Sequence, residues 1–337
     1  MKRIIHLTLW VSLGFLVLFD FRLSTCLAQG SLTPPGAPGP LMKTLSQIEP
    51  RTDVLTLSGD SGNQYIITNS GSYYLSANIV GVSSENGIEV LTNNVALDLN
   101  GFSLLGVPGS GNGIVTGAIT NLTVRNGIVS SWGGHGININ PTGFGSAGVH
   151  FEHLTLSGNA NFGINNNGFA EMRDCMVLNN ASHGIFFGDG GTVANCTVTG
   201  NGAIGIVMDS YTNSIGAVRD CHVDGNHAGI FVAGNGAEVS GNVCSGNNPT
   251  VINGFSGILM GASNCRIENN HVIGSGYAGI LVSNGSYSNN IIIRNCVSGS
   301  GTNNYGLGTN TQIVGPIITN TASGIITNLN PWANFSL

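Results

Sequence analysis

Gly184-Ile185-Phe186-Phe187 and Gly205-Ile206-Val207-Met208 are two copies of a short pattern, a glycine followed by an aliphatic strand. The glycines of all the copies are Gly163, Gly184, Gly205, Gly229, Gly257 and Gly279. Successive glycines lie 21, 21, 24, 28 and 22 residues apart. Self-similarity at such a period is typical of solenoid proteins, in which each repeat forms one coil that packs on the next.

A second motif fills the intervals between these glycines. It places asparagine after apolar or small residues, as in Val193, Cys196, Val198 and Asn201 and again in Val218, Cys221, Val223 and Asn226. Residues two apart on a strand share a face, so Cys196 and Val198 are expected to point inward together. Two or three short strands in a coil of roughly 22 residues leave little room for a helix. The Leu-x-x-Leu-x-Leu signature of leucine-rich repeats is absent from the sequence.

These repeats predict an all-β fold, a right-handed single-stranded parallel β-helix of about ten coils with short N- and C-terminal caps. Stacked coils predict an inward column with one residue per coil: Leu97, Leu122, Leu154, Cys175, Cys196, Cys221, Asn242, Asn270 and Cys296. They also predict a stack at a turn, where the side-chain amides of Asn201, Asn226 and Asn247 hydrogen-bond along the axis.

The two ends of the chain differ from the repeats. We expect a signal peptide over residues 1–28, a Pro/Gly-rich linker over 29–41, an N-terminal cap over 42–80 with a short helix at 42–48, the β-helix over 81–308, and a C-terminal cap and tail over 309–337. No later segment approaches the ~20 consecutive apolar residues of a membrane span. A secreted, cell-surface or periplasmic protein is therefore expected.

Lipid anchoring at Cys26 is the alternative for the N-terminal segment. Thr25 is unusual before a lipidated cysteine, and Asp20 and Arg22 interrupt the apolar run, so we favour cleavage after the small residues near Ala28.

Several stretches outside the repeats carry a family resemblance. They are Gly39-Pro40, Met42-Lys43-Thr44-Leu45, Gln47-Ile48-Glu49-Pro50-Arg51-Thr52, Gly71-Ser72-Tyr73-Tyr74-Leu75, Leu97-Asp98-Leu99-Asn100-Gly101-Phe102 and Asn330-Pro331-Trp332-Ala333-Asn334-Phe335. With the repeats, the chain resembles the pectin-lyase-like right-handed parallel β-helix superfamily, and within it a group of uncharacterised secreted bacterial β-helix repeat proteins. The resemblance covers nearly the whole mature chain and implies fold and export, but no established activity or catalytic residues.

The composition excludes some classes of partner. The net charge is −6, and Lys43 is the only lysine after residue 28, so the basic stripe of a nucleic-acid-binding protein is missing. Charged residues make up only 8% of the chain and it has 52 glycines, yet 41% is hydrophobic, which is too high for a disordered Gly-rich tail.

His135 is a weak catalytic candidate. Gly134-His135-Gly136 matches one polygalacturonase-like motif, and Arg266-Ile267-Glu268 half-matches another, but Asn-Thr-Asp and Asp-Asp are absent from the sequence. His135 and His183 both precede a Gly-Ile strand, so the repeat alone can produce the match. An ordinary turn histidine is the alternative.

Asp189 and Asp209 are a candidate carboxylate pair. Each follows the same strand on adjacent coils, and inverting glycoside hydrolysis needs two carboxylates roughly 6.5–9.5 Å apart. Two solvated turn aspartates are the alternative reading.

Asp174 and Asp220, beside Arg173 and Arg219, form the only acidic and basic cluster in the repeats. A lyase would use such residues to hold Ca²⁺ and to supply a base, so Ca²⁺ is expected only if the protein is a lyase. The structural alternative is an outward row of cross-coil ion pairs, with Glu152 beside Arg173 and Glu268 beside Arg294.

No zinc-type spacing is found among His150, His153, His222, His227 and His271, so no cofactor or metal site is predicted. Cys175, Cys196 and Cys221 fall in the inward column, where a small buried hydrophobe suffices, and we expect free thiols.

Phe186, Val207, Phe231, Leu259 and Leu281 form an apolar stripe at outward positions of consecutive coils. Either the loops Asp209 to Gly216 or Asn247 to Gly254 cover it, or it contacts a partner, and we hypothesise that it is the working face.

Three classes of function remain, one of which is a self-associating structural rod that uses the apolar stripe or the uncapped ends of the solenoid. A surface or extracellular binding or structural module fits best, contacting a polysaccharide or another cell-surface component, with turn aromatics such as Trp132, Tyr211, Tyr277 and Tyr287 as contacts. The alternative is a polysaccharide lyase or glycoside hydrolase that acts on an acidic polysaccharide. The oligomeric state stays open.

Overall fold

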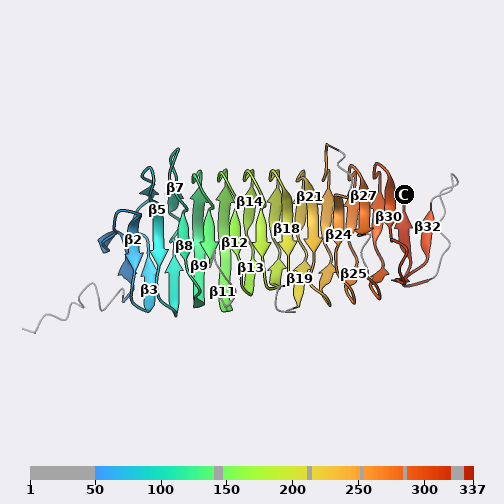
Figure 1. Cartoon of the computed structure of the whole chain (residues 1–337), viewed down its shortest axis with the longest axis horizontal. Helices are drawn as coiled ribbons and strands as arrows, with labels where there is room; N and C mark the ends of the chain where they lie inside the picture. Colours follow the sequence, from blue (N-terminus) through green and yellow to red (C-terminus); the bar gives the residue numbers. More distant parts are fainter. Residues whose placement is uncertain (1–49, 140–146, 211–214, 251–253, 284–286, 320–329) are drawn as a thin grey trace, which may run out of the picture. The chain divides into compact units, whose positions relative to one another are not determined.

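The computed structural model describes residues 50–139, 147–210, 215–250, 254–283, 287–319 and 330–337. The chain divides into two units, Met1–Pro50 and Arg51–Leu337, and the description below concerns the second. In this unit, parallel strands wind into a right-handed β-helix of about ten coils, stacked side by side from one end to the other (Figure 1). The predicted fold class is confirmed. The expected signal peptide, linker and short helix at 42–48 lie outside the described residues.

One side of each coil contributes a strand to an 11-stranded parallel sheet. Its strands are β2 (Asn63–Ile67), β5 (Asn86–Val90), β8 (Ile114–Thr116), β10 (Ile137–Ile139), β12 (Ile164–Asn166), β15 (Ile185–Phe187), β18 (Ile204–Met208), β21 (Ala228–Val232), β24 (Ser256–Met260), β27 (Ala278–Val282) and β30 (Asn303–Gly306). The recurring Gly-Ile pattern lies in this sheet, and its isoleucines point inward with no exposed surface.

The other two sides of the coils form a 22-stranded parallel sheet. The first side consists of β1 (Thr52–Asp53), β3 (Gly71–Tyr74), β6 (Val95–Asp98), β9 (Thr120–Ser130), β11 (Ala147–Ser157), β13 (Ala170–Arg173), β16 (Gly191–Ala194), β19 (Gly216–Arg219), β22 (Glu238–Ser240), β25 (Arg266–Glu268), β28 (Ile291–Ile293) and β31 (Ile313–Val314). The second side consists of β4 (Ile79–Val80), β7 (Ser103–Leu105), the later halves of β9 and β11, β14 (Met176–Leu178), β17 (Thr197–Thr199), β20 (His222–Asp224), β23 (Val243–Ser245), β26 (His271–Ile273), β29 (Cys296–Ser298), β32 (Ile317–Thr319) and β33 (Asn334–Ser336). A 3-10 turn, η1 (Val54–Thr56), follows β1.

In most coils a residue in the left-handed conformation forms the bend between these two sides. The non-glycine bend residues, with φ between 51° and 58°, are Asn100, Asn126, His153, Asp174, Asn195, Asp220, Asn269 and Arg294, and Gly241 takes this place between β22 and β23. Asn and Asp tolerate this conformation better than most residues, because their short polar side chains can bond locally. The backbone therefore accounts for an Asp at positions 174 and 220.

The core is a set of inward columns of mostly aliphatic side chains, and its largest fully buried side chains are the aromatic rings of Trp132, Phe151 and Phe187. Trp132 has no exposed surface, and its indole Nε1 donates to the Leu104 carbonyl at 3.2 Å. Glycines make room for it: a Cβ on Gly87 would lie 2.8 Å from its ring. Trp132 was predicted to be a turn aromatic that contacts carbohydrate, and that prediction is wrong because these glycines let the ring enter the core.

An asparagine ladder joins successive coils, as predicted. Asn180 donates from its backbone N to Asn201 Oδ1 at 3.0 Å and from its Nδ2 at 2.9 Å. Asn201 does the same to Asn226 at 2.9 and 2.9 Å, and Asn226 to Asn247 at 3.1 and 3.2 Å. These asparagines are buried, so each oxygen satisfies two donors that have no water available.

The predicted inward column is right over its central part and wrong at both ends. Leu154, Cys175, Cys196, Cys221, Asn242 and Asn270 do follow one another on consecutive coils. Leu97, however, pairs with Val124 and Leu122 with Val149, because the register there advances by 27 residues per coil. At the other end the column continues through Asn295, whose Oδ1 accepts from Asn270, and Cys296 lies beside it.

We expect Asn201→Ala to lower the stability of the solenoid. It removes the acceptor of two buried donors of Asn180, and each buried donor left unsatisfied costs about 1–3 kcal/mol. Urea unfolding followed by circular dichroism should show a lower midpoint. Thr197→Ala, at a half-buried outward position on β17, is the control and should shift the midpoint much less. Equal midpoints for the two variants would contradict a structural role for the ladder.

Candidate functional site

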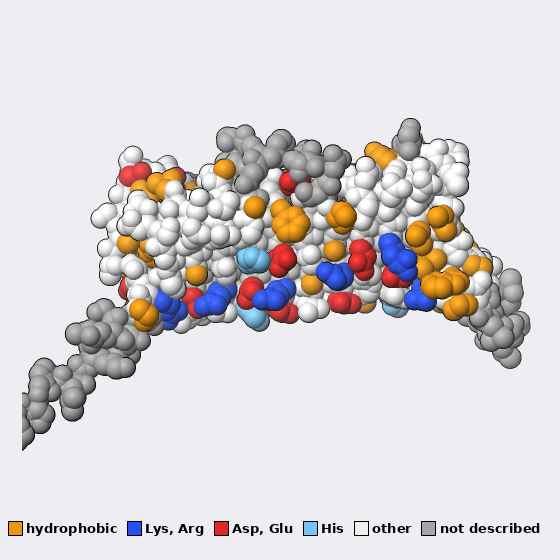
Figure 2. Space-filling view, turned by 90° about the horizontal axis from the view of Figure 1, so that it is seen from below, with side chains coloured by type: hydrophobic (Ala, Val, Ile, Leu, Met, Phe, Trp, Pro, Cys, Tyr) orange, Lys and Arg blue, Asp and Glu red, His pale blue; other side chains and the backbone are white. Residues whose placement is uncertain are grey.

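The outward residues on the first side of the 22-stranded sheet include four of the six arginines of residues 51–337. Strand pairing places one residue per coil in a row: Asp98, Arg125, Glu152, Arg173, Ala194, Arg219, Ser240 and Glu268. A parallel row two residues earlier contains Thr123, His150, Glu171, Thr192, Ala217, Glu238 and Arg266. We call these two rows the charged face. Figure 2 shows basic and acidic side chains in a line along the solenoid, with hydrophobic side chains gathered at its C-terminal end.

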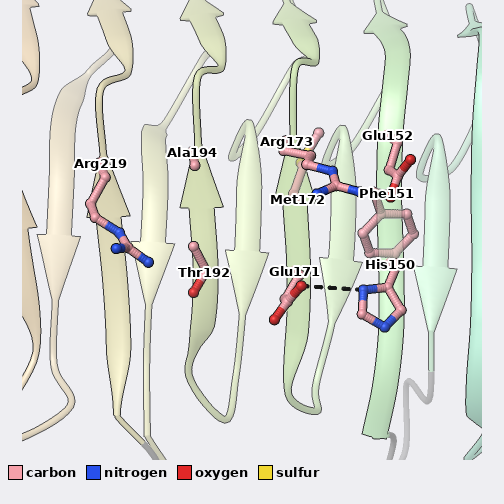
Figure 3. A pocket seen from close by; sticks show the side chains of 9 residues that line it. All are labelled: His150, Phe151, Glu152, Glu171, Met172, Arg173, Thr192, Ala194 and Arg219. Carbon is pink, nitrogen blue, oxygen red and sulfur yellow. Dashed lines mark hydrogen bonds and ion pairs between the residues drawn. The ribbon is translucent and has the colours of Figure 1, made fainter.

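A groove of about 220 Å³ lies in the charged face over β11, β13, β16 and β19. Its lining residues are His150, Phe151, Glu152, Glu171, Met172, Arg173, Thr192, Ala194 and Arg219. The small side chains Thr192 and Ala194 form the floor between Arg173 and Arg219 (Figure 3). The groove exists because one coil bears small side chains where its neighbours bear arginine.

The side chains on the N-terminal wall of the groove are paired with one another. Arg173 donates to Glu152, and this contact raises the pKa of the Arg173 guanidinium. His150 Nδ1 lies 3.4 Å from Glu171 Oε2 (Figure 3). Farther along the row, Asp98 Oδ2 lies 3.3 Å from Arg51 and 3.2 Å from Arg125.

Arg219 forms the opposite wall and differs from these residues. Its neighbours in the row are Ala194 and Ser240, which are uncharged, and its own side chain is exposed. Among the described residues, no carboxylate lies within ion-pair distance of it. In Figure 3 its side chain extends toward the strand that carries Thr192 and Ala194, whereas the Arg173 guanidinium points toward Glu152. The space above Ala194 therefore has a guanidinium available on one side.

The predicted cluster of Asp174, Asp220, Arg173 and Arg219 is only partly brought together. The two arginines line the groove, but the two aspartates lie one residue later, at the bends. Asp174 Oδ2 is 4.0 Å from His153 Nε2 on the preceding coil.

The cross-coil ion pairs were predicted correctly for Glu152 and wrongly for Glu268. Glu152 does accept from Arg173. Glu268 pairs instead with Arg266 on its own strand at 2.7 Å, which holds the pKa of the Glu268 carboxyl below its usual value. Ile293 occupies the position next to Glu268 in the row, so Arg294 falls at the bend, where its guanidinium stacks 4.4 Å from the Trp332 ring.

Asp189 and Asp209 lie at the ends of β15 and β18, away from the groove lining. Asp189 forms an isolated antiparallel bridge with Ser210, and the Asp209 carbonyl accepts from the Gly190 N–H at 2.9 Å. The Asp209 carboxylate accepts from the Ser210 N–H at 2.8 Å. These contacts hold the turn that leads into the next coil.

His135 lies on the outer side of the 11-stranded sheet. Its Nδ1 accepts the Phe162 N–H of the next coil at 3.3 Å, and its ring meets the Phe162 ring edge-on at 5.0 Å. His183 is held in the same way, with its Nδ1 accepting the Ile204 N–H at 3.1 Å. Burial lowers the pKa of both histidines.

The apolar stripe of Phe186, Val207, Phe231, Leu259 and Leu281 is confirmed as one row on consecutive coils. Its centre is packed: Val207 is buried, in a cluster with Ile204 and Ala228 on which Phe186, Phe231 and Phe255 rest. Parts of the two loops expected to cover the stripe, 211–214 and 251–253, lie outside the described residues. Because this row is packed on itself, we place the candidate site on the charged face.

The remaining turn aromatics predicted as carbohydrate contacts are Tyr211, Tyr277 and Tyr287. Tyr277 and Tyr287 are half-buried, Tyr287 against the core, and Tyr211 lies outside the described residues. A second groove of about 390 Å³ lies at the C-terminal end and is lined mainly by Ile291, Ile293, Ile313, Val314, Pro316 and the exposed Trp332.

The cysteines do not add a reactive group to the groove. Cys175, Cys196, Cys221, Cys244 and Cys265 are buried free thiols, and Cys296 is half-buried. Burial raises the pKa of Cys244 to about 12, and a hydrogen bond to Cys196 together with burial raises the pKa of Cys175 and of Cys221. They act as small core side chains, as expected.

The described part of the chain contains no group of three or more His, Cys, Asp or Glu side chains placed to hold a metal ion. Within the same residues, no helix has the length and apolar character needed to cross a membrane.

Comparison with a family model supports the fold. Residues 189–331 match the family model described as "Right handed beta helix region". The A-module of mannuronan C-5 epimerase AlgE4 from Azotobacter vinelandii is similar at 15% identity and TM-score 0.49, covering 78% of this chain and 84% of that one. The receptor binding domain of the siphovirus 9NA tailspike is similar at 12% identity and TM-score 0.44, covering 75% and 54%. A search of curated proteins gives no match. These similarities are too distant to carry over a ligand or an activity.

We expect stability to fall as the pH drops below about 6.5, because the folded chain binds protons at His135 and His183 less readily than the unfolded chain, whose histidines have an ordinary pKa. Protonation would also remove the Nδ1 acceptors of Phe162 and Ile204. Thermal unfolding at about pH 7.5 and about pH 5.5 measures this effect.

His183→Asn should weaken that pH dependence, and His222→Asn, at an exposed position on β20, should leave it unchanged. An identical pH profile in all three proteins would refute the assignment.

Proposed function

The chain is a right-handed parallel β-helix, and we propose that it is a recognition module that binds an anionic polysaccharide on its charged face. The observation that carries the proposal is the space above Ala194, with Arg173 on one side and Arg219, which has no carboxylate partner among the described residues, on the other. A guanidinium binds a carboxylate through two parallel hydrogen bonds, which gives both affinity and orientation.

The other charges on this face argue for a carboxylated glycan rather than a nucleic acid. Glu152 and Glu171 line the same groove as the arginines, and the chain as a whole has a net charge of −6. A continuous phosphate backbone in the groove would meet these carboxylates, and the affinity of nucleic-acid binders depends on many basic contacts. A glycan with separated carboxylates can meet the arginines and present hydroxyls to the acidic residues.

The shape of the site also favours a long polymer. The charged face follows the solenoid axis over successive coils (Figure 2), and the groove in that face is open to solvent rather than a closed pocket. Small-molecule sites are typically deeper and bury most of their ligand. Export through residues 1–28 belongs to this proposal and is supported by the basic start, apolar run and small residues of that segment.

A polysaccharide lyase or glycoside hydrolase at the same groove is the second candidate. It is favoured by His150 and Glu171, whose Nδ1 and Oε2 atoms lie 3.4 Å apart at the edge of the groove. A carboxylate that orients an imidazole in this way can support proton transfer to or from a bound sugar. Glu152, in contrast, is held by Arg173.

Binding should be tested with the purified protein on a glycan array and then by calorimetry with the anionic polysaccharides that bind. Arg219→Ala should weaken binding by about 10- to 100-fold, because a charge-assisted hydrogen bond contributes about 1.5–3 kcal/mol. Arg294→Ala removes the same charge from an exposed residue outside the groove and should have little effect. If no anionic polysaccharide binds, or if both variants bind like the unaltered protein, the proposal fails.

The same samples distinguish recognition from catalysis. Polysaccharides incubated with and without Ca²⁺ should yield no unsaturated or reducing-end products. If the unaltered protein forms such products and both His150→Asn and Glu171→Gln abolish them, the protein is an enzyme and the recognition proposal is wrong.

A further inference from the structure

Four arginines of the charged face recur on every second coil. Arg125 lies on β9, Arg173 on β13, Arg219 on β19 and Arg266 on β25. The strands between them, β11, β16 and β22, carry no arginine or lysine. Neighbouring strands lie ~4.8 Å apart, so the arginines recur at ~9.6 Å along the axis.

Ion pairing within the protein explains only part of this period. Arg125 and Arg173 alternate with Asp98 and Glu152, which is the arrangement that keeps like charges apart. Arg219 continues the period, but its neighbours in the row, Ala194 and Ser240, are uncharged. Pairing with a carboxylate of the row therefore does not explain an arginine at this position.

The paired arginines keep donors for a ligand. The Arg125, Arg173 and Arg266 side chains remain 43%, 60% and 41% exposed beside their carboxylate partners. A guanidinium has five N–H donors, and one contact with a carboxylate leaves several of them free.

We propose that a polyuronate chain lies along the solenoid axis with one sugar residue per coil, so that every second carboxylate meets one of these four arginines. This inference rests on the proposed function and adds the direction, register and length of the ligand. The strand spacing of ~4.8 Å is close to the rise of one pyranose residue in an extended 1,4-linked chain.

The alternation of the arginines fits the symmetry of such a chain. In an extended two-fold polyuronate, successive carboxylates point to opposite sides, so those on one side recur at every second residue. The small side chains of Ala194 and Ser240 then face the sugars whose carboxylates point to solvent. Arg266 lies one row aside from the other three but on the coil that the period requires.

The span of the arginines sets the length of the ligand. Six strand spacings separate the coil of Arg125 from that of Arg266, ~29 Å, which corresponds to about seven sugar residues. Affinity for 1,4-linked oligomannuronates of about three to about ten residues should therefore rise with length and level off near seven. Affinity that stops rising at three residues, or keeps rising through ten, would contradict this register.

Two charge-matched double variants test the period itself. Arg219→Ala/Ala217→Arg moves the arginine to the neighbouring row of the same coil, as in Arg266. Arg219→Ala/Ser240→Arg moves it to the next coil. Both new arginines lie near Glu238, and both variants keep the net charge. Thermal unfolding confirms that each is folded before its binding of a seven-residue oligomannuronate is measured.

The same-coil variant should bind within a few-fold of the unaltered protein, and the shifted variant should bind about tenfold more weakly. Equal recovery in both would show that charge rather than spacing matters; the register would then be wrong while the proposed function stands. Loss in both would also overturn the period, because a single position would then be decisive. If the unaltered protein binds no polyuronate but does bind another anionic polysaccharide, the polyuronate register is wrong while the proposed function stands. If it binds neither, both proposals are wrong.

Discussion

The solenoid depends on buried asparagines that close one coil and bond to the next. Each of Asn201, Asn226 and Asn247 offers one oxygen to two donors of the preceding coil, at distances between 2.9 and 3.2 Å. Leaving such donors unpaired in a buried turn is costly, and only an amide of this length supplies an acceptor and a donor together. A second ladder through Asn242, Asn270, Asn295 and Asn334 repeats this arrangement at another bend. The two ladders fix how each coil sits on its neighbour.

The repeat made most of this architecture predictable from sequence. The Gly-Ile period and the recurring asparagines indicated the coil, the stack of Asn201, Asn226 and Asn247, and the outward apolar stripe, because each depends on spacing within or between adjacent repeats. The prediction of the inward column failed where the number of residues per coil changes and no motif in the sequence marks the change. The 27-residue step between Asp98 and Arg125 moved Leu97 and Leu122 out of the expected column. Trp132 could not be recognised as a core residue, since its space is made by glycines on other coils, such as Gly87.

The site was predictable in its parts but not in its arrangement. Arg173 and Arg219 stood out as charged residues of an outward row, and the pairing of Arg173 with Glu152 followed from their alignment. The groove depends on the small side chain of Ala194. That this residue lies between Arg173 and Arg219 can be recognised only when the register of the neighbouring strands is known. A one-residue error at the C-terminal end was enough to give Glu268 the wrong partner: Ile293, and not Arg294, stands next to it in the row.

The ladders and the charged face are linked through the rigidity of the spacing. A protein surface can select a polymer by its repeat distance only if the spacing between the surface groups is fixed. In this fold each coil is fixed to the next by backbone hydrogen bonds along three strands and by the buried amides at the bends. The arginines therefore keep a constant separation of two coils even though their long side chains are exposed. Because the scaffold holds that separation, little ordering entropy is lost beyond that of the side chains and the glycan when an extended chain binds. In the binding that we propose, the asparagines fix the distance between coils, and the arginines on every second coil contact the ligand at that interval.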